Sequence, residues 1–202
     1  EAAAVFEVKA QMIASLGSGL DRAAYMLKLR LQADLARALA NLNEDRAGSL
    51  ALLDHCYEMF PGDGTLADYF FPSLRKAGLI EEHDAWFKKS WDRMSGVVAK
   101  YPGSSNTLNT AGWLAAKAQR NLDQAESYLE RALAMKPDEY SYLDTMAEIQ
   151  FGKGNREKAI EWSTRAVEYI PGDSGDPSDG SLLDSFMLRR QHEHFRSDPM
   201  PK

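Results

Sequence analysis

The chain has a single cysteine, no long apolar run and few β-branched aliphatic residues. Cys56 alone cannot form an internal disulfide, which is compatible with a reducing compartment but does not identify one. No apolar stretch approaches the length that a membrane span needs. Valine and isoleucine are sparse beside alanine and leucine, and this balance favours helices over strands.

An excess of basic residues is also missing. The 24 Lys and Arg residues are outnumbered by 30 Asp and Glu residues, which gives a formal net charge of -6. Such a chain lacks the positive surface that neutralises phosphates, so we expect no nucleic-acid partner. The sequence begins at Glu1 and not at a methionine, so we expect a processed product or a segment of a longer protein, with its localisation unassigned.

What the chain does have is an internal repeat with a spacing of 34 residues between Asn106 and Asp173. The first members are Asn121, Ala125, Arg131, Ala132 and Pro137, and they recur as Asn155, Ala159, Arg165, Ala166 and Pro171. Each copy reads as a helix, a short break, a second helix and a proline, and its alanines allow two helices to approach closely. A fixed period of this length predicts a stacked array of helix pairs.

Two earlier prolines, Pro61 and Pro102, are preceded by the same pattern as Pro137 and Pro171. A small residue lies twelve positions before the proline, a variable residue eight before it and a small residue five before it. The frame is Ser49, Leu53 and Cys56 before Pro61, and Ser90, Met94 and Val97 before Pro102. We therefore predict four second helices that belong to four helix pairs.

These signals predict one all-α domain over residues 1–202, a solenoid of about four helix pairs with a leading helix and a capping helix. Its expected segments are a leading helix at 1–19, an irregular pair at 20–62, an irregular long pair at 63–105, a pair at 106–138, a second regular pair at 139–172, a loop at 173–180, a capping helix at 181–196 and a frayed tail at 197–202.

Local signals refine the irregular part. Leu27 is expected to face inward on the first long helix, and Asn43 can cap the helix that follows. Pro72 either kinks a helix or restarts it with the proline in the first turn. The stretch 79–99 is longer than the second helices of the other pairs. The extra residues either lengthen its helix or form a bulged loop near His83.

Residues 106–173 resemble the tetratricopeptide repeat family. The resemblance rests on small residues, a turn glycine and closing prolines at Ala125, Ala132, Pro137, Ala147, Gly154, Ala159, Ala166 and Pro171. The first copy departs from the family at Gly112-Trp113, where leucine and a small residue are usual, and carries Arg120-Asn121 in its turn. The run from Tyr142 to Glu148 is similar to the last full repeat of long bacterial arrays.

The resemblance implies a right-handed superhelix of antiparallel helix pairs, whose concave groove holds a peptide or a partner's helix. Most members of the family are scaffolds without chemistry of their own. The implied groove positions are Thr107, Thr110, Leu114 and Lys117 in one pair and Ser141, Asp144, Glu148 and Phe151 in the next. Asp144 and Glu148 favour a neutral or basic partner segment.

Residues that could carry chemistry have simpler interpretations. His192 and His194 lie two positions apart on an expected helix, so their rings point in different directions and do not easily share a metal. Cys56 occupies the place of Ala132 and Ala166, which predicts a buried packing residue and not a nucleophile. We expect no catalytic residue, cofactor or metal site.

The two places where an aspartate and a histidine are adjacent in the sequence also do not indicate a catalytic site. Asp54-His55 and His83-Asp84 are adjacent in the sequence, and adjacent residues on a helix do not face each other, so a catalytic dyad is not expected. The four tryptophans are expected in the core. Phe70-Phe71, beside a proline, is the strongest candidate for an exposed aromatic patch, and such patches mark partner sites.

The sequence thus predicts a non-enzymatic scaffold that binds a protein or peptide in its groove and is part of a larger protein, with self-association left open. One alternative is a regulatory or substrate-presenting arm of a larger enzyme. Another is a helical repeat that binds single-stranded RNA, which the acidic charge disfavours.

Overall fold

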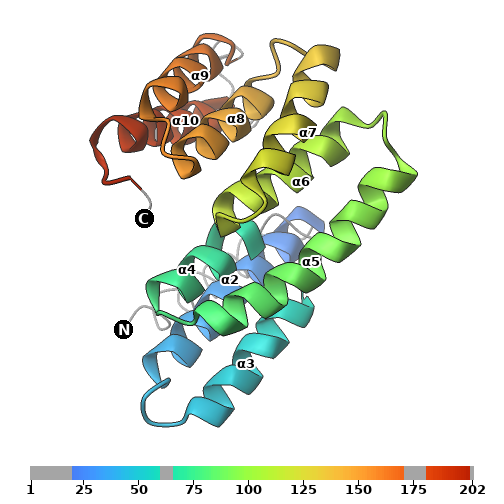
Figure 1. Ribbon diagram of the computed structural model, residues 1–202. Coiled ribbons are helices and arrows are strands. Elements are labelled where there is room, and N and C mark those ends of the chain that lie inside the picture. The colour runs from blue at the N-terminus through green and yellow to red at the C-terminus, as the bar shows by residue number, and fades with distance from the viewer. Residues whose placement is uncertain (1–19, 60–65, 171–180, 201–202) are drawn as a thin grey trace. The chain divides into compact units, whose positions relative to one another are not determined.

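The computed structural model describes residues 20–59, 66–170 and 181–200, and in these ranges all regular secondary structure is helical (Figure 1). The predicted all-α class is confirmed, with helices packed in adjacent pairs as in a helical solenoid. The chain divides into two compact units, Glu1–Ser90 and Trp91–Lys202, and each is described by itself. The expected leading helix at 1–19 and loop at 173–180 lie outside the described residues.

The first unit begins with the helices α2 (Leu20–Ala40) and α3 (Arg46–Met59), which pack against each other. Asp45 caps α3, because its carboxylate accepts the Gly48 amide at 2.9 Å, so the prediction of an Asn43 cap is wrong by two residues. The inward placement of Leu27 is also wrong, since its side chain is 46% exposed. Leu31 and Leu35 instead form the buried stripe of α2.

Pro72 changes the helix type where it enters the chain. A π-helical turn, η1 (Leu66–Phe70), runs directly into α4 (Phe71–Lys76), and Pro72 lies in the first turn of α4. Proline lacks an amide hydrogen and its ring excludes the carbonyl four residues earlier, so a regular α-helix cannot continue through this point. Of the two alternatives for Pro72, the structure shows the restart.

An aromatic cluster fills the core of the first unit. Tyr57 packs on Phe70 and Trp86, with ring centroids 6.2 and 6.4 Å away, and Phe71 meets Phe87 edge-on at 6.0 Å. Phe70 and Phe71 are fully buried, so their expected role as an exposed patch is wrong. A proline next to two aromatic residues is therefore not a sign of exposure here, because both rings lie in the core.

The helix α5 (Ile80–Lys100) is a single helix of 21 residues, so the extra length predicted at 79–99 lies in the helix itself. Its register differs from the expected frame at one position. Ser90 is buried as predicted, but Val97 is 42% exposed and Val98 is buried in its place. Val98 follows Trp91 by seven residues, so it continues the buried side of α5, and Val97 lies beside that side.

The second unit contains two regular helix pairs. The helices α6 (Ser105–Ala118) and α7 (Leu122–Met135) form one pair, and α8 (Tyr140–Gly152) and α9 (Arg156–Glu168) form the other (Figure 1). The predicted small residues of the second helices, Ala125, Ala132, Ala159 and Ala166, are all fully buried. Their burial confirms that thin side chains mark the contacts between helices.

The turns inside the two pairs end their first helices in the same way. In each, the left-handed residue after the helix donates its amide to a carbonyl three positions back, and the next amide reaches five positions back, which is a Schellman motif. Gln119 and Gly154 are these left-handed residues and lie 35 positions apart, whereas α7 and α9 begin 34 positions apart. The first copy therefore has one extra residue in its turn, where Asn121 is also left-handed.

The capping helix α10 (Ser181–Ser197) packs against α9 as predicted, and the chain after it is anchored. Met200 packs on a cluster that includes Ala147, Phe151 and Phe195. Arg156 donates to the backbone carbonyls of Phe195 and Asp198. The expectation of a frayed tail is therefore wrong up to Met200, because apolar contacts and a guanidinium hold it.

Candidate partner-binding surfaces

The accessible face of α6 is the first candidate. Asn106, Thr110, Trp113 and Lys117 follow one another at spacings of three or four residues, so they share one side of the helix. Asn106 is exposed and the other three are half-buried, whereas Leu108, Ala111 and Ala115 on the opposite side are fully buried. We call Asn106, Thr110, Trp113 and Lys117, with Ser141 and Glu148 of α8, the repeat face.

A polar network crosses the repeat face. The Lys117 ammonium lies 3.1 Å from Glu148 Oε1, and Gln191 of α10 donates to Glu148 Oε2 at 2.7 Å. Lys117 also lies over the Trp113 ring, 4.9 Å from its centroid. Because both oxygens of Glu148 have partners, its charge is matched inside the protein, and Lys117 and Trp113 form a cation–aromatic pair beside it.

The eight groove positions implied by the family register differ in accessibility. Thr107, Thr110, Lys117 and Ser141 are half-buried, whereas Leu114, Asp144, Glu148 and Phe151 are buried. The Phe151 ring lies under α10, with its centroid 5.2 Å from that of Phe195. Because the first copy has one extra residue in its turn, the position of α6 that corresponds to Glu148 of α8 is Trp113 and not Leu114. The sequence had led us to expect Trp113 in the core. The 35-residue spacing of the first helices, visible in the sequence as Leu108-Asn109-Thr110 and Leu143-Asp144-Thr145, was the available signal.

A second ionic network ties α7 to the end of α8. The Lys153 ammonium lies 2.6 Å from Asp123 Oδ1 and also bonds Glu126. The hydrogen bond from Lys153 lowers the pKa of Glu126, and the bonds to Asp123 and Glu126 raise the pKa of Lys153. These groups stabilise each other's charged forms, so we interpret them as a connection between consecutive helix pairs.

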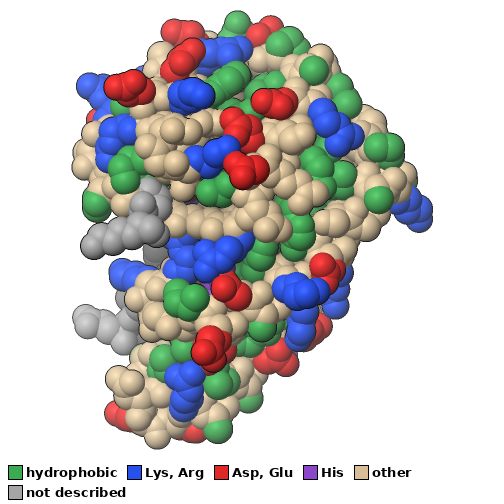
Figure 2. Space-filling view, viewed as in Figure 1, with side chains coloured by type: hydrophobic (Ala, Val, Ile, Leu, Met, Phe, Trp, Pro, Cys, Tyr) green, Lys and Arg blue, Asp and Glu red, His purple; other side chains and the backbone are tan. Residues whose placement is uncertain are grey.

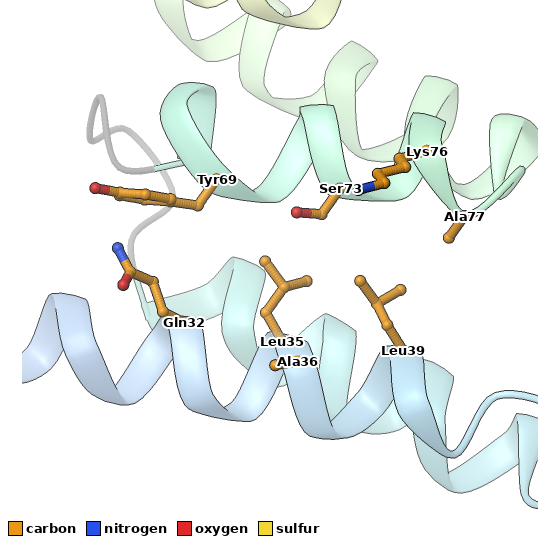
Figure 3. Close-up of a pocket in the computed structure, with 8 residues that line it drawn as sticks. All are labelled: Gln32, Leu35, Ala36, Leu39, Tyr69, Ser73, Lys76 and Ala77. Carbon is orange, nitrogen blue, oxygen red and sulfur yellow. The ribbon is translucent and has the colours of Figure 1, made fainter. Parts of the chain in front are cut away.

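The first unit carries a cleft of about 370 Å³ between α2 and the η1–α4 segment (Figure 3). Its lining residues are Gln32, Leu35, Ala36 and Leu39 of α2, Tyr69 of η1, and Ser73, Lys76 and Ala77 at α4. Leu35 and Leu39 point from α2 toward the wall that carries Tyr69, Ser73 and Lys76 (Figure 3). We call this the α2–α4 cleft. No motif in the sequence pointed to it.

The residues considered for chemistry lie in structural environments. Burial raises the pKa of Cys56 to about 12, and Asp34 adds to the shift, so the thiol is a poor nucleophile. His192 bonds the Ser163 hydroxyl and His194 bonds Asp198, so the two rings have different partners. Within the described ranges, no three His, Cys, Asp or Glu side chains are grouped to hold a metal ion.

The side chains of His83 and Asp84 are in contact, contrary to the expectation for neighbours on a helix. The two side chains do meet, with Nδ1 of His83 2.8 Å from Oδ1 of Asp84, although they are neighbours in the sequence. His83 is fully buried and its ring packs edge-on against Phe71 at 5.3 Å. The carboxylate thus orients a buried histidine that belongs to the aromatic core.

Comparison with known proteins identifies one part of the chain. Residues 106–139 match the family model described as tetratricopeptide repeat. The match covers the α6–α7 pair and reaches the start of α8. No curated protein matches the chain. Each helix in the described ranges is too short or too polar to cross a membrane.

Proposed function

We propose that this chain, a tetratricopeptide repeat protein, is a non-enzymatic scaffold that binds a segment of a partner protein on its repeat face. Tetratricopeptide repeats are typically protein-interaction modules without catalytic activity. The observation that carries the proposal is the accessible side of α6, which lies inside the matched repeat and presents Thr110, Trp113 and Lys117.

The chemistry of the repeat face indicates the partner. Trp113 offers a large, rigid aromatic surface, and aromatic residues are enriched where interfaces gain most of their binding energy. Lys117 is bonded to Glu148, so a partner meets an ion pair and not a single uncompensated charge. We therefore expect a segment with an apolar side chain over Trp113 and uncharged hydrogen-bonding groups near Lys117 and Glu148. Of the neutral or basic segment that Asp144 and Glu148 favoured, this proposal keeps the neutral alternative.

Surface charge supports a protein partner over a nucleic acid. Figure 2 shows acidic and basic side chains interspersed on the face that it presents. Phosphate binding relies on clustered positive charge, and the chain carries an excess of acidic residues. If the chain is instead an arm of a larger enzyme, we propose that it binds through the same repeat face. The partner would then be the enzyme or its substrate, and the binding surface would be the same.

The test is a peptide array probed with two variants that place the same arginine in matched positions. Thr110 lies at the centre of the repeat face and donates its hydroxyl to the carbonyl four residues earlier, as Thr164 does on α9. Thr110→Arg should abolish the binding of array peptides that combine an apolar side chain with uncharged hydrogen-bonding groups, because it obstructs the face, whereas Thr164→Arg should leave their binding unchanged. If both variants bound like the parent, the repeat face would not be the binding surface.

A further inference from the structure

The α2–α4 cleft lies outside the matched repeat, and we propose that it is a second docking site. Its occupant is a short extended segment of a partner protein that presents one large apolar side chain beside a carboxylate. The inference rests on the interaction role proposed above but not on the repeat face, because every lining residue belongs to the first unit.

The floor of the cleft is apolar and has the size of a binding site. Leu35, Ala36 and Leu39 follow Gln32 at helical spacing, so α2 presents one continuous side to the cleft. The volume of about 370 Å³ lies within the range of small-ligand sites, which is roughly 300–1,000 Å³. An apolar side chain entering this space is removed from water, and its burial is the main favourable contribution to binding.

The opposite wall supplies the polar groups. Tyr69, Ser73 and Lys76 are spaced four and three residues apart, so they form a stripe along η1 and α4 (Figure 3). Lys76 is the only charged residue among the eight that line the cleft, which makes a carboxylate the complementary group. Across residues 20–59, 66–170 and 181–200, no group is bonded to the Lys76 ammonium or the Ser73 hydroxyl.

The π-helical turn contributes to the same site. Tyr69 lies in η1 and lines the cleft, and its side chain remains accessible although Phe70 and Phe71 beside it are fully buried. Single π-helical turns occur frequently at functional sites, where they redirect side chains. The turn forced by Pro72 therefore separates two rings that build the core from one ring that faces the cleft.

The length of the two stripes limits the occupant. Each stripe runs over eight residues of helix, from Gln32 to Leu39 and from Tyr69 to Lys76, and its seven steps correspond to about 10 Å. That length accommodates about three residues of an extended chain. An extended backbone needs hydrogen-bond partners, and the Gln32 amide and the Ser73 hydroxyl supply them at the two walls. An extended segment of about three residues therefore fits better than a whole helix.

An immobilised array of octapeptides tests the proposal. Each peptide carries one Leu or Phe in a Gly-Ser frame, with Glu, Gln or Lys placed one to three positions away. The full chain should bind the Glu peptides roughly fivefold more strongly than the Gln peptides, as expected for one accessible ion pair. Lys76→Glu should reverse the preference toward the Lys peptides. Lys28→Glu is the control, because it makes the same charge change on an exposed part of α2 outside the cleft.

Three results would overturn the proposal. They are no binding to any peptide of the array, equal binding of the Glu, Gln and Lys peptides, and an unchanged Glu preference in a Lys76→Glu variant that unfolds at the same temperature as the parent. Thr110→Arg separates the two surfaces. If it removed the Glu-selective binding while Lys76→Glu did not, the cleft would be excluded and the repeat face retained. The opposite outcome would support the cleft and leave the repeat face to be tested on its own ligands.

Discussion

Gly112 shows how little space separates α6 from α7. A Cβ atom at this position would lie 2.0 Å from Cδ2 of Leu129, and Leu129 is fully buried, so it cannot turn toward solvent. We expect Gly112→Ala to destabilise the fold by about 1–2 kcal/mol, because overpacking outweighs the better helix propensity of alanine. Urea denaturation measures the change.

Gly96 is the matched control. It also lies inside a helix, α5, but apart from its chain neighbours and the adjacent backbone of that helix no atom lies within 4 Å of the Cβ that alanine would add. Gly96→Ala should therefore stabilise the protein by about 0.5–1 kcal/mol through helix propensity alone. Equal effects of the two substitutions would show that the close approach of Leu129 to Gly112 is not a constraint.

Cys56 gives a prediction about pH. Its pKa is about 12 in the folded chain and 9.0 by reference, so the folded state holds the thiol proton more tightly than the unfolded state does. The resulting stabilisation is complete below pH 9 and is lost as the pH rises from 9 toward 12. Cys56→Ala should therefore lose less stability over this interval than the parent. Thermal unfolding of both proteins between pH 8 and 10.5 measures the difference, and parallel curves would contradict the assigned burial.

For individual residues, the sequence predicted the burial of small side chains well and the burial of large side chains less well. Cys56, Ala132 and Ala166 were placed correctly because a contact between two helices admits only thin side chains. Phe70 was not, because the direction of a large side chain depends on the local helix geometry. The π-helical turn η1 changed that geometry, and it leaves no pattern in the spacing of apolar residues.

Among the elements, α10 is held through Phe195, the most deeply buried of its described side chains, those of residues 187–197. Phe195 is fully buried against Phe151, whereas Met187 on the same helix is 53% exposed. Phe195→Ala should cost about 3–5 kcal/mol and release α10 from α8 and α9, because it leaves a cavity in the terminal cluster.

Hydrogen–deuterium exchange across residues 187–200 measures this release. Exchange should accelerate in Phe195→Ala and stay at the parental rate in Met187→Ala, which removes a side chain of comparable size from the surface. An unchanged rate in Phe195→Ala would mean that the hydrogen bonds from Arg156 and Gln191 hold the helix without the aromatic contact.

The elements of the second unit could be predicted because two copies of one pattern reinforce each other. The repeated alanines and prolines specified the pairs α6–α7 and α8–α9. The extra residue between Gln119 and Leu122 was missed, because the 34-residue spacing was read from the second helices alone. Pro72 left two alternatives, since a proline excludes a regular helix without specifying what replaces it.

For the whole molecule, the sequence predicted the fold class better than it predicted which side chains are accessible. A helical array follows from periodicity, but accessibility depends on which helices cover which residues. Phe151 fits the groove register and is nevertheless covered by α10, and Trp113 was assigned to the core although it is half-buried on the repeat face. The α2–α4 cleft could not be predicted, because its two walls are brought together only by folding.

The central claim is that a partner segment binds the repeat face. Hydrogen–deuterium exchange of the full chain, alone and with a saturating peptide chosen from the array by its loss of binding in Thr110→Arg, tests it directly. We expect slower exchange in α6 and α8, around Thr110 and Glu148, and unchanged exchange in α9 around Thr164. Protection confined to α9, or no protection in α6, would contradict it.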